Sequence, residues 1–457
     1  MAIANQNESS CVGQIVRGLL SRAPMVALMI TAAWCSANVT WAEQPVTSIS
    51  LISVVDIAGD APDRSNLAGM KKPESTSDSV LDPSASSDQT FPANIFGGIS
   101  AVDWSGEGND YWFLADRGPL DGAVDWPCRL HKVRLNFAAS DTGQDAGKLS
   151  AEIIETVFLE DFYGHRFTGL ASALKSTTEH PVRLDPEGLR VSPKGTFYIS
   201  DEYGPRLMEF SREGRLIREL TMPAHYQCTC PATTWQEELP QNDSGRQSNR
   251  GMEGLAISGD GNRLFGMMQS PLLQDCQRIN KTAKPIGCNC RLPVFSAKGD
   301  LEAEYVYQLD DQNLKLNEII ECGPDQLLTI ERDGLQGASA ACKKLMLISL
   351  REATNVAGRD EALTDELAKN VKTVKKQVLL NLLDPKWHLA GDQMPEKLES
   401  LAFGPDLPDG RRLLIVVSDN DFEMDHPTHV YAFAIPKELL EQPLADKKLK
   451  GSELSAR

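Results

Sequence analysis

The sequence is short of positive charge, and this shortage narrows the classes of partner that the protein can bind. Lys and Arg number 46 against 64 Asp and Glu, so the chain carries a formal charge of -18 at pH 7. This balance argues against nucleic acid or an anionic membrane surface as a partner, because both repel an acidic protein. Aromatic residues make up 6 % and hydrophobic residues 41 % of the 457 residues. These values exclude a mainly disordered chain or one with many membrane spans.

Several motifs of common enzymes are also missing. The sequence has no Gly-x-Ser-x-Gly turn, no Walker glycine loop, no His-Glu-x-x-His pair and no Gly-x-Gly-x-x-Gly after an expected strand. A serine nucleophile therefore has no support. If the protein hydrolyses a substrate, attack by water assisted by a metal ion is the simpler mechanism.

The apolar run near the N-terminus is too short for a membrane span. It covers residues 25–34, whereas a spanning helix needs roughly 20 apolar residues. Two arginines precede the run and small residues follow it, which predicts a signal peptide over residues 1–42, cleaved after Ala42. We therefore expect a secreted or periplasmic protein with no membrane contact after cleavage. A retained anchor and a lipid on Cys35 are the alternatives.

Removal of this segment leaves eight cysteines. An even number in an exported protein favours disulfides. The alternative is a zinc site built from the Cys-x-Cys segments at 228–230 and 288–290, although this spacing differs from the usual zinc knuckle. The candidate disulfide pairs are Cys322 with Cys342 and Cys276 with Cys288.

One theme recurs along the chain and decides the expected architecture. Each copy is a short strand, a turn, a second strand and a polar end. The spacing is 66 residues from Glu187 to Glu253, 65 from Glu253 to Glu318 and 81 from Glu318 to Glu399. Antiparallel sheets repeated at such a spacing are what a β-propeller requires. The five copies cover residues 97–119, 186–205, 252–272, 317–334 and 398–422.

The sequence therefore predicts an all-β fold, a six-bladed β-propeller over residues 43–440. Five units are visible, but the mature length divided by the 66-residue spacing gives about six, so we infer a sixth blade. We expect closure by pairing of the N-terminal strand at 48–58 with the C-terminal strand at 429–436, which leaves no exposed sheet edge. A mobile loop at 59–94 and a charged tail at 441–457 complete the organisation. A pair of β-sandwiches is the alternative.

The repeats also place glutamates at matching positions. The glycines Gly188 and Gly254, which follow two of them, suit the crowded inner strand of a blade. If these glutamates and the acidic ends of the next strands face one opening, protons or a cation must relieve their repulsion. An all-oxygen ligand set favours calcium or magnesium over zinc. Alternatively, such carboxylates are structural, accepting backbone N–H bonds or pairing with arginines. The glutamates are Glu187, Glu253, Glu318 and Glu399.

Four segments carry a resemblance to a known family. They are DPEGLRVSPKGTFYISDEYGP (185–205), NRGMEGLAISGDGNRLFGMMQSPL (249–272), ECGPDQLLTIERDG (321–334) and LESLAFGPDLPDGRRLLIVVSDNDF (398–422). Over nearly all of residues 95–436 the chain resembles the phytase-like family called "esterase-like activity of phytase". The resemblance implies an exported β-propeller associated with hydrolysis of phosphate esters or other esters. It supplies no catalytic set, and the signature motifs of calcium-dependent alkaline phytases are missing, so phytate is not inherited as a substrate.

We therefore expect an exported, monomeric hydrolase of small phosphate esters or simple esters that uses a divalent cation, calcium in the first place. A non-catalytic propeller that binds a glycan, peptide or envelope partner is the alternative. The carboxylates expected to bind the cation are Glu187, Glu253, Glu399, Asp201, Asp419 and Asp421. The expected catalytic groups are Glu202, Glu253, Glu331 and Arg332. The expected substrate-binding residues are Arg117, Arg206, Tyr203 and Gln269.

Overall fold

The computed structural model of the protein describes residues 48–71, 90–137, 149–177, 181–359, 361–364, 366 and 370–444. The expected signal peptide, its cleavage site at Ala42 and the lipid alternative at Cys35 lie outside these residues. So do residues 72–89 of the expected loop and residues 445–457 of the expected tail. None of the helices in the described ranges is both long and apolar enough to span a membrane.

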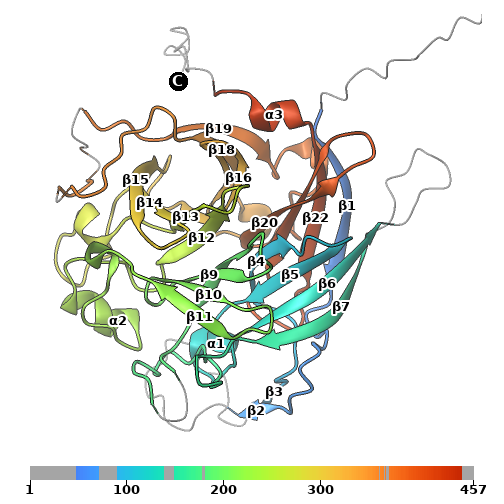
Figure 1. Ribbon diagram of the computed structural model, residues 1–457, viewed down its shortest axis with the longest axis horizontal. Coiled ribbons are helices and arrows are strands. Elements are labelled where there is room, and N and C mark those ends of the chain that lie inside the picture. The colour runs from blue at the N-terminus through green and yellow to red at the C-terminus, as the bar shows by residue number, and fades with distance from the viewer. Residues whose placement is uncertain are drawn as a thin grey trace, which may run out of the picture. The chain divides into compact units, whose positions relative to one another are not determined.

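The described strands form five four-stranded antiparallel sheets, which are the blades of a propeller (Figure 1). Blade one contains β4 (Ile99–Trp104), β5 (Asp110–Ala115), β6 (Arg129–Phe137) and β7 (Leu149–Phe158). Blade two contains β8 (Pro186–Val191), β9 (Phe197–Asp201), β10 (Arg206–Phe210) and β11 (Leu216–Leu220). Blade three contains β12 (Met252–Ile257), β13 (Arg263–Met268), β14 (Asn289–Ser296) and β15 (Leu301–Gln308). Blade four contains β16 (Lys315–Gly323), β17 (Gln326–Arg332), β18 (Lys343–Ser349) and β19 (Lys375–Asn381). Blade five contains β20 (Lys397–Asp406), β21 (Arg412–Asp419), β22 (Thr428–Ile435) and β1 (Ser50–Ile57).

The inner strands of the five blades form a closed ring. They contact one another in the order β4, β8, β12, β16 and β20, and β20 returns to β4. The packing is tight, because a Cβ on Gly254 in β12 would lie 2.6 Å from the backbone oxygen of Asn317 in β16. A Cβ on Gly188 in β8 would lie 2.7 Å from the Cβ of Leu255. The expected need for glycine at these two positions is therefore confirmed.

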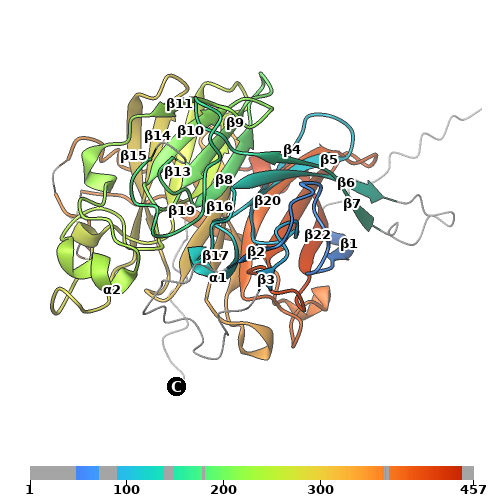
Figure 2. The same cartoon turned by 90° about the horizontal axis from the view of Figure 1, so that it is seen from below.

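Blade five joins both ends of the described chain. Strand β1 pairs antiparallel with β22, with Val54 opposite Tyr431, and Figure 2 shows the two strands together from a second direction. The predicted closure is confirmed. The predicted sixth blade is wrong, since the described strands make five blades. The N-terminal strand completes blade five, and connections such as residues 221–251 take up the length that we had assigned to a further blade.

Apolar side chains fill the spaces between neighbouring blades. Trp112 of β5 and Phe197 of β9 meet edge to face between blades one and two, with ring centroids 5.0 Å apart. Residues in the middle of each sheet are covered on both faces, which explains their nearly continuous hydrophobic runs. The remaining short strands and α-helices are β2 (Met70–Lys71), β3 (Thr90–Phe91), α1 (Pro119–Gly122), α2 (Trp235–Glu238) and α3 (Lys437–Glu441). The 3-10 turns are η1 (Ala224–Tyr226), η2 (Leu239–Gln241), η3 (Leu273–Asp275), η4 (Gly337–Ser339) and η5 (Pro385–Trp387).

The expected disulfide between Cys322 and Cys342 does not form, and both residues are buried free thiols. Cys322 lies near the end of β16, whereas Cys342 immediately precedes β18. Because β17 is antiparallel to both strands, these positions fall at opposite ends of blade four. The pairing of Cys276 with Cys288 stays a prediction. The three groups of side chains able to hold a metal among the described residues contain no cysteine, so the zinc alternative gains no support.

Candidate cation-binding site

One irregularity recurs near the start of the inner strand in all five blades. The register between the inner strand and its neighbour shifts there, which marks a β-bulge. A bulge adds one residue to the strand and re-aims its side chain. The added residues of different blades meet one another, and we call them the bulge ring. The bulge ring consists of Ser100, Glu187, Glu253, Asn317 and Glu399.

In blade four the register shift spans Asn317 and Glu318. Asn317 is the residue that contacts Glu253 and Glu399, so the expected assignment of Glu318 to the equivalent position is wrong. The carboxylate of Glu318 instead accepts the backbone N–H groups of Leu255 at 3.1 Å and Ile319 at 3.0 Å. It also pairs with Arg190 at 2.9 Å. These contacts join the inner strands of blades two, three and four, so Glu318 has a structural role.

Three members of the bulge ring are glutamates whose carboxylates converge. Glu187, Glu253 and Glu399, here called the glutamate triad, have oxygens within 4.8 Å of one another. Their exposed fractions are 7 %, 5 % and 6 %. The amide of Asn317 donates to Glu253 at 2.6 Å and to Glu399 at 3.2 Å, and Arg332 donates to Glu399 at 2.6 Å. The structure thus brings together the three glutamates that the sequence placed at equivalent strand positions.

The glutamate triad has fewer hydrogen-bond donors than its buried oxygens need. Gln269 donates to Oε1 of Glu253 at 2.8 Å. Among the described residues, however, no donor reaches Oε2 of Glu253 or Oε1 of Gln269, and both atoms are buried. Burial, followed by repulsion from nearby carboxylates, raises the pKa of Glu187 and Glu253 well above the usual range. Such oxygens are costly to bury, so this arrangement requires protons or a cation.

A second group of carboxylates shares Glu187 with the triad. Asp185, Glu187 and Glu202 also have oxygens within 4.8 Å of one another. Burial and the charge of Asp185 raise the pKa of Glu202 to about 7. Here the protein supplies its own cation, because Arg117 pairs with Asp185 and lies 3.7 Å from Glu202. In the glutamate triad Arg332 pairs with Glu399, but Oε2 of Glu253 has no donor among the described residues. The triad is therefore the better place for a metal ion.

A second ring of polar residues lies where the second strand of each blade ends. Burial and the charge of Asp419 raise the pKa of Asp116 well above its usual range. Burial and the charge of Asp421 raise the pKa of Asp419 to about 7. Lys397 contacts Asp419 at 3.2 Å and also pairs with Asp421, so these two expected metal ligands already share a cation. The second ring consists of Asp116, Glu202, Gln269, Arg332 and Asp419.

Glu331, an expected catalytic residue, does not reach the site. It precedes Arg332 in β17, and neighbouring residues of a strand point to opposite faces. Its carboxylate accepts a hydrogen bond from the Tyr307 hydroxyl at 2.7 Å and pairs with Lys376 at 2.8 Å. Glu331 therefore connects strands β15, β17 and β19, and its carboxylate does not reach the centre of the ring.

Asp201 and Arg206, expected to bind metal and substrate, are committed to each other at 2.6 Å. Asp201 also accepts the backbone N–H groups of Asp185 and Gly204, each at 2.9 Å, so its oxygens are satisfied. The hydroxyl of Tyr203 donates to a backbone carbonyl at 3.2 Å. These three residues shape the turn after β9, and only their neighbour Glu202 reaches the triad.

Sequence reasoning missed several residues that the fold brings to the site. One signal in the sequence could have identified Asn317. Lys-Leu-Asn at 315–317 aligns without a gap with Lys-Leu-Glu at 397–399, which places Asn317 at the position equivalent to Glu399. Asp185 and Arg250 stand just before inner strands, where the repeats share no pattern. The missed residues are Asp185, Arg250, Lys315, Asn317 and Lys397.

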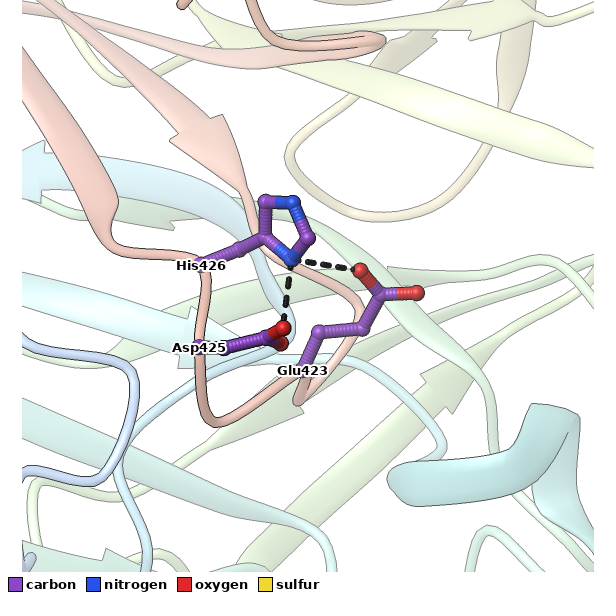
Figure 3. A group of neighbouring side chains, drawn as sticks. All are labelled: Glu423, Asp425 and His426. Carbon is purple, nitrogen blue, oxygen red and sulfur yellow. Dashed lines mark ion pairs between the residues drawn. The ribbon is translucent and has the colours of Figure 1, made fainter.

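A third group able to hold a metal lies on the loop between β21 and β22. Figure 3 shows the two carboxylates of Glu423 and Asp425 directed at one ring nitrogen of His426. The distances from Nδ1 are 2.8 Å to Glu423 and 3.2 Å to Asp425. All three side chains are exposed, so water solvates them and screens their charges. They form a surface ion-pair group rather than a buried site.

Comparison with known proteins places the described ring within a family. Residues 94–422 match the family described as phytase-like, with esterase-like activity of phytase. A curated relative, an uncharacterized secreted protein of Arthroderma benhamiae, is 28 % identical over 206 residues. The match covers 36 % of this chain and 40 % of that relative, so the chain spans less than half of the relative's length.

Several solved structures are similar to the chain at low identity. The PQQ-bound aldose sugar dehydrogenase of Streptomyces coelicolor is 12 % identical, with a TM-score of 0.31, and the match covers 74 % of this chain and 80 % of that one. The virginiamycin B lyase of Staphylococcus aureus is 9 % identical, with a TM-score of 0.30, and the match covers 74 % and 95 % of the two chains. Scores this low support no argument about the chemistry of the site.

Proposed function

The chain belongs to the phytase-like family, and on that premise we propose that it is an exported hydrolase of phosphate esters or simple esters that uses a divalent cation. The cation is calcium, bound by Glu187, Glu253 and Glu399. Export is supported by the secreted relative and by the signal-peptide pattern at residues 1–42.

The observation that carries this proposal is the geometry of the glutamate triad. Two oxygens on opposite sides of a calcium ion, each about 2.4 Å from it, lie about 4.8 Å apart. The triad oxygens fall within that span. The undonated oxygens of Glu253 and Gln269 offer further ligands of the hard type that calcium prefers.

Neighbouring residues hold the triad in place and supply proton transfer. Arg332 and Asn317 fix Glu399 and Glu253, and their nitrogens are committed to these contacts. Glu202 carries a carboxylate that interacts with Glu253, and it accepts a proton from the attacking water. A bound divalent cation would supply positive charge that polarises the ester.

Hydrolysis of p-nitrophenyl phosphate and p-nitrophenyl acetate by the purified protein tests the proposal. We expect activity that EDTA removes and calcium restores, together with bound metal in the protein as isolated. Glu253→Gln abolishes activity without lowering the melting temperature measured in EDTA. The matched control is Glu209→Gln, which alters a buried glutamate paired with Arg218 away from the triad and retains activity. If the folded protein hydrolyses neither ester, a non-catalytic binding propeller is favoured. If the activity is insensitive to EDTA, the proposed role of the cation is wrong.

A further inference from the structure

Lys315 and Lys397 begin the inner strands of blades four and five at matching positions, but they have different partners. Lys397 stands opposite Asp419 and contacts its carboxylate at 3.2 Å. Lys315 stands opposite Arg332, a second cation. Within the described part of the chain, the half-buried side chain of Lys315 forms no ion pair. Lys315 therefore lacks a direct ion-pair partner among the described residues.

Arg250 is a second half-buried cation of this kind. It stands directly before Gly251, whose N–H donates to Glu202 at 3.2 Å, so its backbone is anchored to the site. Its guanidinium reaches the hydroxyl of Ser270 at 3.5 Å, and no carboxylate of the described residues pairs with it. Lys315 is anchored in the same way, because the next residue donates its N–H to the carbonyl of Gln269 at 3.2 Å.

The two cations lie on neighbouring segments beside the glutamate triad. Gln269 joins these segments, because its N–H donates to the carbonyl of Gly251 at 3.0 Å and its carbonyl accepts the N–H of Leu316 at 3.2 Å. The side chain of Gln269 donates to Glu253. Burial and the positive charges of Arg332 and Arg250 lower the pKa of Lys315 to about 8, while the charge of Glu253 opposes this shift. Burial also lowers the pKa of Arg250, whereas the charges of Glu202 and Glu253 oppose this shift and the charge of Arg332 adds to it. Lys315 is thus still mostly protonated at pH 7. Three cations stand together beside Glu253.

We propose that Lys315 and Arg250 form a binding subsite for a doubly charged oxyanion, so that the ester is a phosphate monoester. Two cations that lack direct ion-pair partners match the charge of a phosphate group near neutral pH. Arginine and lysine also offer several N–H donors to its oxygens. Arg332 is not counted, because it already donates to Asn317 at 2.9 Å and to Glu399 at 2.6 Å.

The assignment of a phosphate monoester as substrate rests on the proposed function. The binding of phosphate at Lys315 and Arg250 does not. In the proposed reaction the oxygen of water forms a bond to phosphorus, the bond from phosphorus to the alcohol oxygen breaks, and a proton moves to the alcohol. Inorganic phosphate is the second product. It is therefore a probe that occupies the subsite without any turnover.

Calorimetric titration of the purified protein with inorganic phosphate at pH 7 in EDTA tests the subsite. Without a divalent cation, phosphate binding reports the basic residues alone. We expect Lys315→Met and Arg250→Gln each to weaken binding by about tenfold or more, since each removes a charge-assisted donor. Lys315→Arg keeps the charge and retains binding. The matched control Lys298→Met, at an exposed turn of blade three, leaves binding unchanged. Sulfate competes with phosphate and acetate does not.

The outcomes separate this assignment from the proposed function. No phosphate binding by the wild-type protein in EDTA, or equal binding by folded Lys315→Met and Arg250→Gln, overturns the subsite even if esters are hydrolysed. Phosphate binding that depends on both residues supports the subsite even if no ester is hydrolysed. Melting curves verify folding, and either variant suffices for the test if the other does not fold. In an active enzyme, Lys315→Met raises KM for p-nitrophenyl phosphate but not for p-nitrophenyl acetate.

Discussion

The side-chain amide of Asn317 donates a 2.6 Å hydrogen bond to Glu253 from the position that carries glutamate in blades two, three and five. The same amide donates to Glu399 at 3.2 Å. A fourth glutamate at this position would add charge beside Glu253, whose pKa is already raised, whereas an amide supplies donors without charge. Asn317 therefore holds two members of the triad together.

Replacing this amide by a carboxylate should make the protein depend more strongly on calcium. Asn317→Asp removes two hydrogen bonds and adds repulsion, which we expect to cost about 1–3 kcal/mol in the free energy of unfolding in EDTA. Added calcium should restore most of this loss, because a fourth carboxylate strengthens attraction for the cation. Calorimetric melting with EDTA and with calcium measures both effects. An equal loss in the two conditions would contradict a cation at the triad.

Removal of one triad carboxylate should have the opposite signature. At a calcium concentration 100 times Kd, the wild-type protein should be stabilised by about 2.7 kcal/mol. Glu253→Gln should lose most of this gain, yet be no less stable in EDTA, since it removes a buried acid that lacks a donor at Oε2. Urea unfolding with and without calcium measures the difference. Glu321→Gln, a half-buried glutamate at the far end of β16, is the control that keeps the calcium gain. Retention of the gain by Glu253→Gln would exclude Glu253 as a ligand.

The propeller was predictable because its repeats preserve a strand, a turn and a polar end in each blade. The number of blades was not, because counting by length treats connections as sheets. Residues 221–251 hold α2 and two 3-10 turns instead of a blade. The five visible repeats were the correct count, and the strand at Ser50–Ile57 closes the last of them.

The site was predictable only where side chains follow the repeat. Glu187, Glu253 and Glu399 were predicted because glutamate recurs at one position of the repeat, and the fold places a β-bulge at that position. Matching the blades by residue type assigned Glu318 to this position in blade four. The matching was wrong by one residue, because the residue that the fold places there is Asn317. The prediction of Glu331 as a catalytic residue has a related difficulty, because the sequence does not show which residue at the end of a strand faces the centre of the ring. The basic residues stand at or before the first residue of an inner strand and have no counterpart in most repeats.

Glu331 provides a test of that correction. Glu331→Gln should leave ester hydrolysis unchanged, because its carboxylate contacts Tyr307 and Lys376 away from the triad. It should lower the free energy of unfolding by about 1–3 kcal/mol, since a buried ion pair loses one charge. Steady-state kinetics and urea unfolding of the same preparation separate the two effects. A loss of kcat with unchanged stability would restore Glu331 as a catalytic group.

The close contact of β12 with β16 predicts that the site is sensitive to a single methyl group. Gly254→Ala places a Cβ 2.6 Å from the backbone oxygen of Asn317, and such overpacking typically costs about 1–3 kcal/mol. The strands must separate, so calcium binding should weaken as well. Gly259→Ala is the control, because its Cβ would lie 3.5 Å from the nearest atom, an oxygen of Glu321. Equal stability and calcium affinity of both variants would show that the inner ring is not tightly packed.

The stability of blade one should fall in acid through His131. This histidine is fully buried in β6, and Nδ1 lies 3.1 Å from the Thr156 hydroxyl while Nε2 has no partner among the described residues. Burial lowers its pKa from the ordinary 6.5 to about 3. Between these two pH values the unfolded chain binds a proton at His131 and the folded chain does not. The free energy of unfolding therefore decreases as the pH falls from 6.5 toward 3. Between pH 7 and pH 4 the loss is about 3 kcal/mol.

Carboxyls with raised pKa act in the opposite direction, so the quantity to measure is the difference in the free energy of unfolding in urea between the wild-type protein and His131→Gln, which does not titrate. A difference that is constant with pH would mean that His131 accepts its proton in the folded protein.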